Sequence, residues 1–466
     1  MLRKISIYIF INLLLLSSVH SIHAQNTPDD SLFINEVYKD LLVCGGGYNW
    51  LEHLCVNIGH RVSGSKGLDR ATFYMEHLLD SLGFDSIWLQ PCLVPHWVRG
   101  EKETGKVIKS GIGKFDIDLL ALGNTNGTGP AGLIAPVIMF NDLNELKTTP
   151  KSLIEGKIVF INKHFEDQFQ NTFEGYGATV PTRANGMMAA LEKGALAFIC
   201  RSVTTMADNH PHTGGTRIMD SLQQIPAFAV SINSADKLAI AVTAGKTVLR
   251  LISNAKYLGQ TLGYNIIADI RGNENPEEIL ITAGHLDSWD VGQGAHDDGS
   301  GCVQSIEALH VLKRMGYRPK RTLRVILFTN EENGLSGGNR YKNYADSANE
   351  KIILAVESDA GGHIPLGFSY LNQPEKAKQF NRFIQLTNKE FKSRGLWIKS
   401  GHAGADIEPL KTHQALLLGL MPDSQRYFDY HHSANDTFDK VNKRELHLGT
   451  AAIATLIYYA DKYGCN

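Results

Sequence analysis

The C-terminal half of the chain alternates between short apolar runs, typical of strands, and longer stretches with helical spacing. The predicted strands are residues 265–270, 278–283, 322–329 and 352–358, and the predicted helices are residues 301–315 and 337–344. The run 324–328 is apolar apart from its leading Arg324, so we expect it to be buried on both faces. This half is predicted to be α/β, with a mixed, mostly parallel sheet covered by helices.

The N-terminal part has a different pattern. Residues 40–89 show helical spacing, with a loop rich in Gly and Ser at residues 59–65. Short β-like runs then follow, with one helical stretch at 186–193; the runs are residues 133–140, 157–161, 197–200 and 227–232. We therefore expect a helical N-terminal part (25–108), a compact β-rich insertion (109–256) and a C-terminal α/β part (257–466).

The first 24 residues have the pattern of a cleaved export signal. Arg3 and Lys4 precede an apolar run at residues 5–16, and a short polar stretch with Ala24 follows. A membrane anchor is the alternative, but about 18 apolar residues are needed to span a bilayer and this run is shorter. We expect cleavage after Ala24, a secreted or periplasmic mature protein, and no membrane association after cleavage.

Length and composition limit the possible partners. A chain of 466 residues exceeds what one hydrophobic core usually supports, which favours two domains. The formal net charge of -2 provides no basic surface for a nucleic acid, so we expect no nucleic-acid partner. The six cysteines lack zinc-finger spacing, so we expect no cysteine metal site. Most of them are expected to be small buried apolar residues.

Five polar clusters carry the candidate chemistry. Four of them fall at or just after the ends of predicted strands, the edge at which ligands bind in open α/β sheets. The fifth follows the apolar run 415–420. The clusters are residues 282–289, 292–301, 328–334, 357–362 and 429–437.

The first two clusters suggest metal ligands. Residues two apart in an extended chain share a side, so the Asp287 carboxylate is expected to accept a proton from one ring nitrogen of His285. The other nitrogen would then face a metal. In the second cluster, Asp297 or Asp298 could bridge two cations. The alternatives are an ordinary loop histidine and a glycine-rich turn with a capping aspartate.

The remaining clusters complete a mixed nitrogen and oxygen set. Glu331 and Glu332 end a strand expected to be buried, where unpaired charges are costly and a cation is a reasonable partner. Asp359 ends the next strand, and His432 belongs to the fifth cluster, although paired histidines near an aspartate often simply lie on the protein surface. Together the set suits zinc, or else manganese or cobalt, with one carboxylate left as a base.

The same motifs, in this order, resemble metallopeptidase family 28, a group of zinc exopeptidases, and within it the plasma glutamate carboxypeptidase type. The matching segments are Gly284–Gly301, Asn330-Glu331-Glu332, Glu357-Ser358-Asp359-Ala360-Gly361, His431-His432-Ser433 with Asp436-Thr437, and Arg61-Val62-Ser63-Gly64-Ser65. The resemblance implies a zinc exopeptidase fold in which the insertion is a protease-associated domain.

The resemblance also implies roles for individual residues. Asp297 would bridge two zinc ions, with His285 and Asp359 completing one site. Glu332 and His432 would complete the other. Glu331 would be the general base, Asp287 would support His285, and the Asp297–Asp298 peptide bond would be cis.

The expected function is therefore that of an exported di-zinc exopeptidase that hydrolyses dipeptides or short peptides, of carboxypeptidase or dipeptidase type. An aminopeptidase is the nearest alternative. A receptor-like protein without catalysis and a one-zinc glutaminyl cyclase are the others. The expected partner is a small peptide substrate, and a homodimer is expected by analogy.

Overall fold

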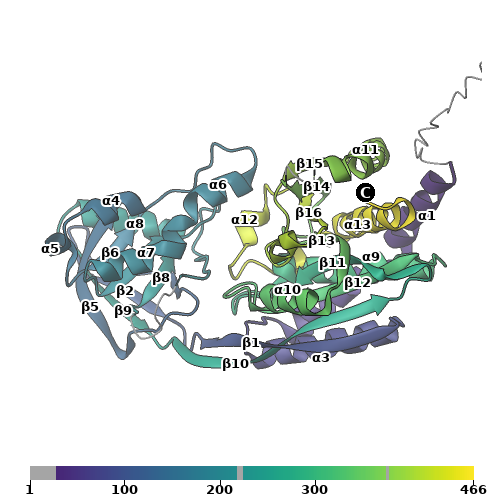
Figure 1. The fold of residues 1–466 in the computed structure, drawn as a ribbon. Coiled ribbons are helices and arrows are strands. Elements are labelled where there is room, and N and C mark those ends of the chain that lie inside the picture. Colours follow the sequence, from purple (N-terminus) through teal and green to yellow (C-terminus); the bar gives the residue numbers. More distant parts are fainter. Residues whose placement is uncertain (1–27, 218–223, 374–376, 466) are drawn as a thin grey trace, which may run out of the picture.

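The computed structural model describes residues 28–217, 224–373 and 377–465, which form two lobes, each built around an eight-stranded sheet (Figure 1). The predicted export signal at residues 1–24 lies outside the described residues. Across the described ranges, every helix is too short or too polar to cross a membrane.

The first sheet has the strand order β1-β10-β12-β11-β13-β16-β14-β15. Its strands are β1 (Ser86–Val98), β10 (Lys256–Ile270), β11 (Asn275–His285), β12 (Arg321–Phe328), β13 (Lys351–Glu357), β14 (Pro365–Leu371), β15 (Trp397–Gly401) and β16 (Leu416–Pro422). The central strands β12, β11, β13 and β16 run parallel, and antiparallel pairs join β10 and β14 to them. This confirms the predicted mixed, mostly parallel sheet.

Helices cover both faces of this sheet. They are α1 (Pro28–Cys44), α2 (Gly47–Glu52), α3 (Lys66–Ser81), α9 (Ser300–Arg314), α10 (Ser336–Ala348), α11 (Ala377–Ser393), α12 (Tyr427–Tyr430) and α13 (Lys443–Tyr463), with short helical turns η1 (His53–Ile58), η2 (Ala295–Gly299), η3 (Glu408–Thr412) and η4 (Phe438–Lys440). Alternation along β11 places Leu280 in the core with α9 and α13, whereas Ile281 packs with Tyr341 of α10. Burial on both faces explains why the strands of this lobe are so apolar.

The predicted helical region 40–89 is wrong at its end, because residues 86–89 begin strand β1. Helix α3 ends at Ser81, and Gly83 adopts φ 73°, a left-handed conformation that commonly follows a helix. From Ser86 the backbone pairs antiparallel with β10. Tertiary pairing therefore overrides the apolar spacing that indicated a helix there.

The second sheet has the order β3-β2-β9-β5-β6-β7-β8-β4. Its strands are β2 (Thr104–Lys109), β3 (Phe115–Ile117), β4 (Leu119–Ala121), β5 (Gly129–Phe140), β6 (Ile158–Ile161), β7 (Ala197–Arg201), β8 (Ala227–Val230) and β9 (Val248–Ser253). Helices accompany it: α4 (Leu143–Thr148), α5 (Lys151–Ile154), α6 (Thr172–Thr179), α7 (Pro181–Glu192) and α8 (Ile232–Thr243). The predicted strands are present, but the region is more helical than expected because β5 to β8 are parallel and need covered faces. The domain boundaries at 109 and 256 stay predictions.

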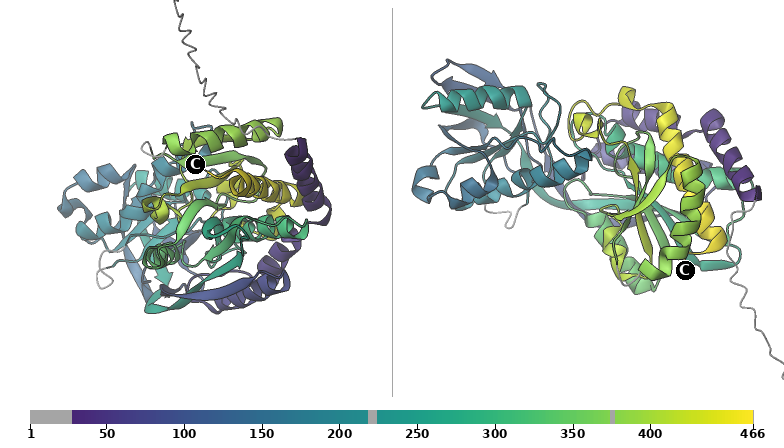
Figure 2. Two further views of the ribbon diagram at one scale, coloured as in Figure 1. Left: turned by 45° about the vertical axis from the view of Figure 1, so that its right-hand side comes forward. Right: turned by 90° about the horizontal axis from the view of Figure 1, so that it is seen from above.

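Strands β1 and β10 run from one lobe to the other (Figures 1 and 2). The lobes also contact each other through loops that carry the predicted motifs. Thr204 donates a hydrogen bond to the Phe428 carbonyl at 2.5 Å, and Asn124 exchanges two 2.9 Å hydrogen bonds with Asn333. The second lobe therefore lies directly against the predicted site.

Candidate active site

Three of the motifs meet at the carboxyl edge of the first sheet. In the parallel register His285 lies beside Phe328, and Ala283 lies beside Glu357, so the residues that follow these strands emerge together. Asn330 adopts φ 65°, and this left-handed turn directs the two glutamates away from the end of β12. Position at the sheet edge was thus correctly predicted for these motifs.

Asp297 lies between two histidines that come from distant parts of the chain. Its Oδ1 is 3.3 Å from Nε2 of His285, and its Oδ2 is 3.1 Å from Nε2 of His432. Each histidine also approaches a second carboxylate: His285 Nε2 is 3.2 Å from Asp359 Oδ1, and His432 Nε2 is 2.9 Å from Glu332 Oε2. The five predicted ligand residues therefore form two groups that share Asp297.

This donor set fits metal ions. Asp297 Oδ2 and Glu332 Oε1 are buried and accept no hydrogen bond from any described residue. Within the same ranges, the ion pairs of these carboxylates involve only histidines, and no lysine or arginine neutralises them. Buried carboxylates without such partners are costly unless cations compensate them. Mixed histidine and carboxylate ligation is typical of zinc.

The protonation behaviour of the site reflects its excess of acids. Burial opposes a charged His285, but the carboxylates of Asp359 and Asp297 outweigh it and hold the pKa of His285 well above its usual value. Burial together with the carboxylate of Asp297 raises the pKa of Glu332 to about 7. Burial and the nearby carboxylates also raise the pKa of Glu331. All three pKa values are raised, so the site favours bound protons or another source of positive charge among these carboxylates.

The turn that carries Asp297 is held by two further aspartates. The Asp297–Asp298 peptide bond is cis, as the resemblance implied. Asp298 accepts hydrogen bonds from the backbone of His285 at 3.0 Å and of Gly301 at 2.9 Å. Asp436 accepts from the backbone of His296 and Asp297 at 2.8 and 3.2 Å. Asp436 lies in a cluster that the sequence singled out, but the sequence gives no sign of this partner.

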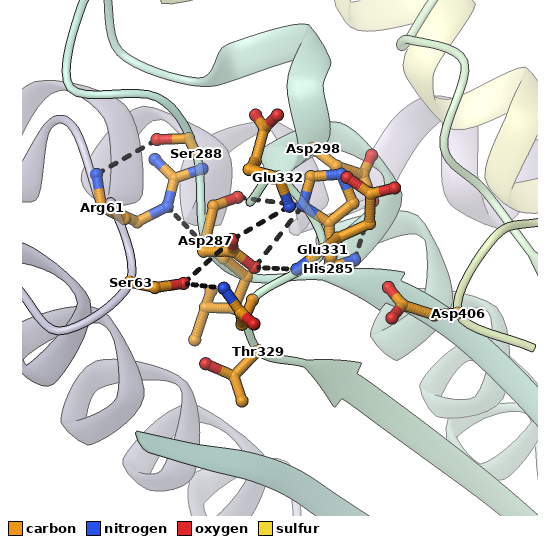
Figure 3. A network of polar contacts seen from close by, with 12 residues as sticks. Arg61, Ser63, His285, Asp287, Ser288, Asp298, Thr329, Glu331, Glu332 and Asp406 are labelled. Carbon is orange, nitrogen blue, oxygen red and sulfur yellow. Dashed lines mark hydrogen bonds and ion pairs between the residues drawn. The ribbon is translucent and has the colours of Figure 1, made fainter. Parts of the chain in front are cut away.

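Asp287 supports the site differently from the way its spacing suggested. The ring nitrogen Nδ1 of His285 lies 3.0 Å from the backbone carbonyl of Asp287, whereas the nearest carboxylate oxygen of that residue is 3.8 Å away. That carboxylate instead accepts hydrogen bonds from the backbone of Glu331 and Glu332 and from the Ser63 hydroxyl (Figure 3). The backbone bends after His285, so the Asp287 carbonyl accepts a hydrogen bond from the ring N–H of His285, and the Asp287 carboxylate holds the turn that carries Glu331 and Glu332.

The second lobe supplies a contact that the sequence did not reveal. Nδ1 of His432 lies 3.2 Å from the backbone carbonyl of Thr213, so this carbonyl accepts a hydrogen bond from the ring N–H while Nε2 faces Glu332 and Asp297. The Thr213 amide in turn donates to the His432 carbonyl at 2.9 Å. A backbone contact between lobes has no side-chain signature, which is why residue patterns missed it.

Comparison with known proteins identifies the family. Residues 265–457 match the model of peptidase family M28. Human carboxypeptidase Q is 34% identical over 423 residues, covering 88% of this chain and 84% of that protein. The chain belongs to peptidase family M28. This M28 peptidase is therefore a metallopeptidase, and the family implies zinc at the site described above.

Other similar proteins include a solved M28 structure and proteins named as aminopeptidases. A peptidase M28 precursor from Shewanella amazonensis has a solved structure with TM-score 0.87 and 31% identity, covering 93% of this chain and 97% of that one. A probable leucine aminopeptidase 2 from Aspergillus oryzae is 25% identical over 301 residues, covering 64% of this chain and 54% of that protein. A zinc aminopeptidase from Bacillus subtilis, with TM-score 0.66 and 18% identity over 90% of this chain and 96% of that one, shows the same fold. Relatives named as carboxypeptidase and as aminopeptidase thus both occur.

Proposed function

We propose that this M28 peptidase is an exported di-zinc exopeptidase that hydrolyses dipeptides or short peptides, of the carboxypeptidase or dipeptidase type. The observation that carries the proposal is the position of Asp297, with one carboxylate oxygen toward each histidine. His285 and Asp359 would hold one ion, and Glu332 and His432 the other. When bound, zinc polarises the scissile carbonyl and stabilises the negative charge that develops on it.

Glu331 would supply the acid–base chemistry. It is half-buried, next to the buried Glu332, so its carboxylate can reach both the ligand set and a substrate. Asp287 fixes its backbone through the 3.1 Å hydrogen bond to the amide of Glu331. In this position the carboxylate takes a proton from the attacking water and later delivers it to the amine nitrogen that leaves.

The carboxypeptidase or dipeptidase type is supported by similarity along most of the chain. The relatives named carboxypeptidase Q match 86–88% of it at 33–35% identity. The fungal relative named aminopeptidase matches 64% of it at 25% identity. An aminopeptidase remains the second candidate because several solved relatives with this fold carry that name. Export is supported by the basic and apolar pattern of the first 24 residues.

Replacing the proposed base tests the function. Glu331→Gln removes the proton acceptor but leaves all five ligand residues, so zinc content should stay unchanged while kcat on a free dipeptide falls about 10²- to 10⁴-fold. Glu36→Gln, which alters an exposed carboxylate on α1, is the matched control and should keep full activity. A Glu331→Gln enzyme with the wild-type kcat would remove Glu331 from the mechanism.

A further inference from the structure

The two proposed metal positions differ in their surroundings. Within the described ranges, every hydrogen bond and ion pair of His285 and Asp359 is made to the first lobe. Glu332 and His432, in contrast, lie where the second lobe rests on the first. Hydrogen bonds from the second lobe reach His432 itself and the residue that follows Glu332. Among these residues, the second lobe therefore makes polar contacts at one pair of proposed ligands and not at the other.

A side chain of the second lobe holds the backbone directly after Glu332. Asn124, in the loop after β4, donates through Nδ2 to the Asn333 carbonyl, and its Oδ1 accepts from Asn333 Nδ2, both at 2.9 Å. Asn333 is 7% exposed, and its Oδ1 accepts in turn from Asn330, which also donates to Ser63 at 3.1 Å. Because the carbonyl and the side chain of Asn333 are both held, the neighbouring backbone of Glu332 has little freedom to move.

The backbone of Thr213 holds His432 at two atoms. The Thr213 carbonyl accepts from the ring N–H of His432 at 3.2 Å, and the Thr213 amide donates to the His432 carbonyl at 2.9 Å. His432 has φ 61°, a left-handed conformation that is costly for residues other than glycine. Such a conformation persists only where neighbouring groups hold it. Two of these groups belong to the second lobe, so the placement of His432 depends on that lobe.

The two segments of the second lobe that make these contacts are bound to each other. The Thr213 hydroxyl donates to the Ala121 carbonyl at 2.8 Å, and the Gly123 amide donates to the Gly214 carbonyl at 3.0 Å. Asn124 directly follows this pairing. Residues 121–124 and 213–214 therefore act as one unit, which contacts the chain beside Glu332 and at His432 together.

The other pair of ligands has its own support. His285 ends β11, its amide donates to Asp298 at 3.0 Å, and its ring nitrogen Nδ1 lies 3.0 Å from the Asp287 carbonyl. Its remaining nitrogen lies 3.2 Å from Asp359, which follows β13 of the same sheet. All of these groups belong to the first lobe. Loss of a contact from the second lobe would leave them in place.

We propose that the second lobe is a positioning element for one of the two metal ions. Asn124 and the backbone of Thr213 set the geometry of Glu332 and His432, so the ion at this pair binds tightly only with the second lobe docked. The ion at His285 and Asp359 does not depend on it. This inference rests on the proposed function, which places two ions at these residues. Groups that orient a metal ligand typically change the metal affinity by about tenfold to a hundredfold when they are removed.

The test uses Asn124→Gly. Asn124 has φ 66°, a conformation that glycine adopts freely, so the variant removes the side-chain amide without straining the loop. Metal-free wild type and variant are titrated with Zn²⁺ against a chromogenic chelator, which yields two dissociation constants for each protein. One constant should rise about tenfold to a hundredfold in the variant, and the other should stay within about twofold of the wild type.

Two further backgrounds assign the affected ion. His432→Ala removes a ligand of one ion only, and adding Asn124→Gly to it should leave the dissociation constant of the remaining ion unchanged. Asp359→Ala removes a ligand of the other ion, and adding Asn124→Gly to that variant should raise the remaining constant about tenfold to a hundredfold. Denaturant unfolding of each metal-free variant checks that the chain is folded.

Asn349→Gly is the matched control. Asn349 also has a left-handed conformation, with φ 51°, but it is exposed at the end of α10 in the first lobe. Both dissociation constants of this variant should equal those of the wild type. The proposal is overturned if Asn124→Gly weakens both ions by the same factor, binds both as tightly as the wild type, or weakens the ion that remains in His432→Ala. A folded wild-type chain that binds a single zinc ion would contradict the proposed function itself.

Discussion

Asp287→Asn tests how the turn that carries both glutamates is held. In the folded protein the Asp287 carboxylate accepts from the backbone of Glu331 at 3.1 Å on one oxygen. Its other oxygen accepts from the backbone of Glu332 and from the Ser63 hydroxyl, both at 3.3 Å. An amide offers only one acceptor oxygen, so its NH₂ group must face at least one buried donor.

The expected cost follows from those contacts. A hydrogen bond to a charged group contributes about 1.5–3 kcal/mol, and an unsatisfied buried donor costs about 1–3 kcal/mol. We therefore expect the free energy of unfolding of Asp287→Asn to fall by about 2–4 kcal/mol. Because the same turn positions Glu331, kcat should fall at least tenfold as well.

Denaturant unfolding and dipeptide hydrolysis, both with zinc in excess, measure the two effects. Ser63→Ala is the control, because it leaves both backbone donors satisfied. It removes the 3.3 Å contact to Asp287 and the 3.1 Å hydrogen bond that the hydroxyl accepts from Asn330 Nδ2, which keeps Asn333 as a partner, so it should cost about 1 kcal/mol or less. If Asp287→Asn matched the wild type in both unfolding free energy and kcat, the carboxylate would not hold the turn and the reasoning would fail.

Two further predictions concern the second lobe. Gly214→Ala should lower the free energy of unfolding by about 1–3 kcal/mol in a denaturant titration, because Gly214 has φ 148° and a Cβ would lie 2.3 Å from Arg183 Cζ. Gly177→Ala, inside α6 where a Cβ meets nothing within 4 Å, is the control and should not lower it. Burial lowers the pKa of His212 to about 4 in the folded protein. As the pH falls, the unfolded chain therefore binds a proton at this residue before the folded protein does. The free energy of unfolding should then fall by about 3 kcal/mol between about pH 6.5 and pH 4. His212→Asn should flatten that slope when metal-free proteins are compared between pH 7 and pH 4.5, and an unchanged slope would show that His212 is not its source.

The sequence predicted the first lobe well because its signals are local. The parallel strands are apolar on both faces, and their ends carry His285, Glu332 and Asp359 in the register that brings them together. The chemical types of the ligands could therefore be anticipated from the residues, whereas their division into two groups came from the resemblance to the family. The start of β1 was missed because Ser86 to Leu89 acquire their conformation only by pairing with β10.

The supporting contacts could not be predicted because they depend on how distant segments pack. The Thr213 carbonyl contacts His432 only because the second lobe packs against α12 and the residues that follow it. The sequence correctly predicted that Asp287 contacts His285, but it predicted the wrong atom of Asp287. The bend after β11 turns the carbonyl of Asp287, and not its carboxylate, toward His285. Residue type and spacing indicate which groups gather, whereas tertiary packing decides which atoms meet.

Zinc stoichiometry with anomalous diffraction at the zinc edge tests the central claim, that two divalent ions compensate the acids at the sheet edge. Two ions per chain are expected, one between His285 and Asp359 and one between Glu332 and His432, with Asp297 contacting both. A zinc-saturated crystal with one ion or none at these residues would contradict the account.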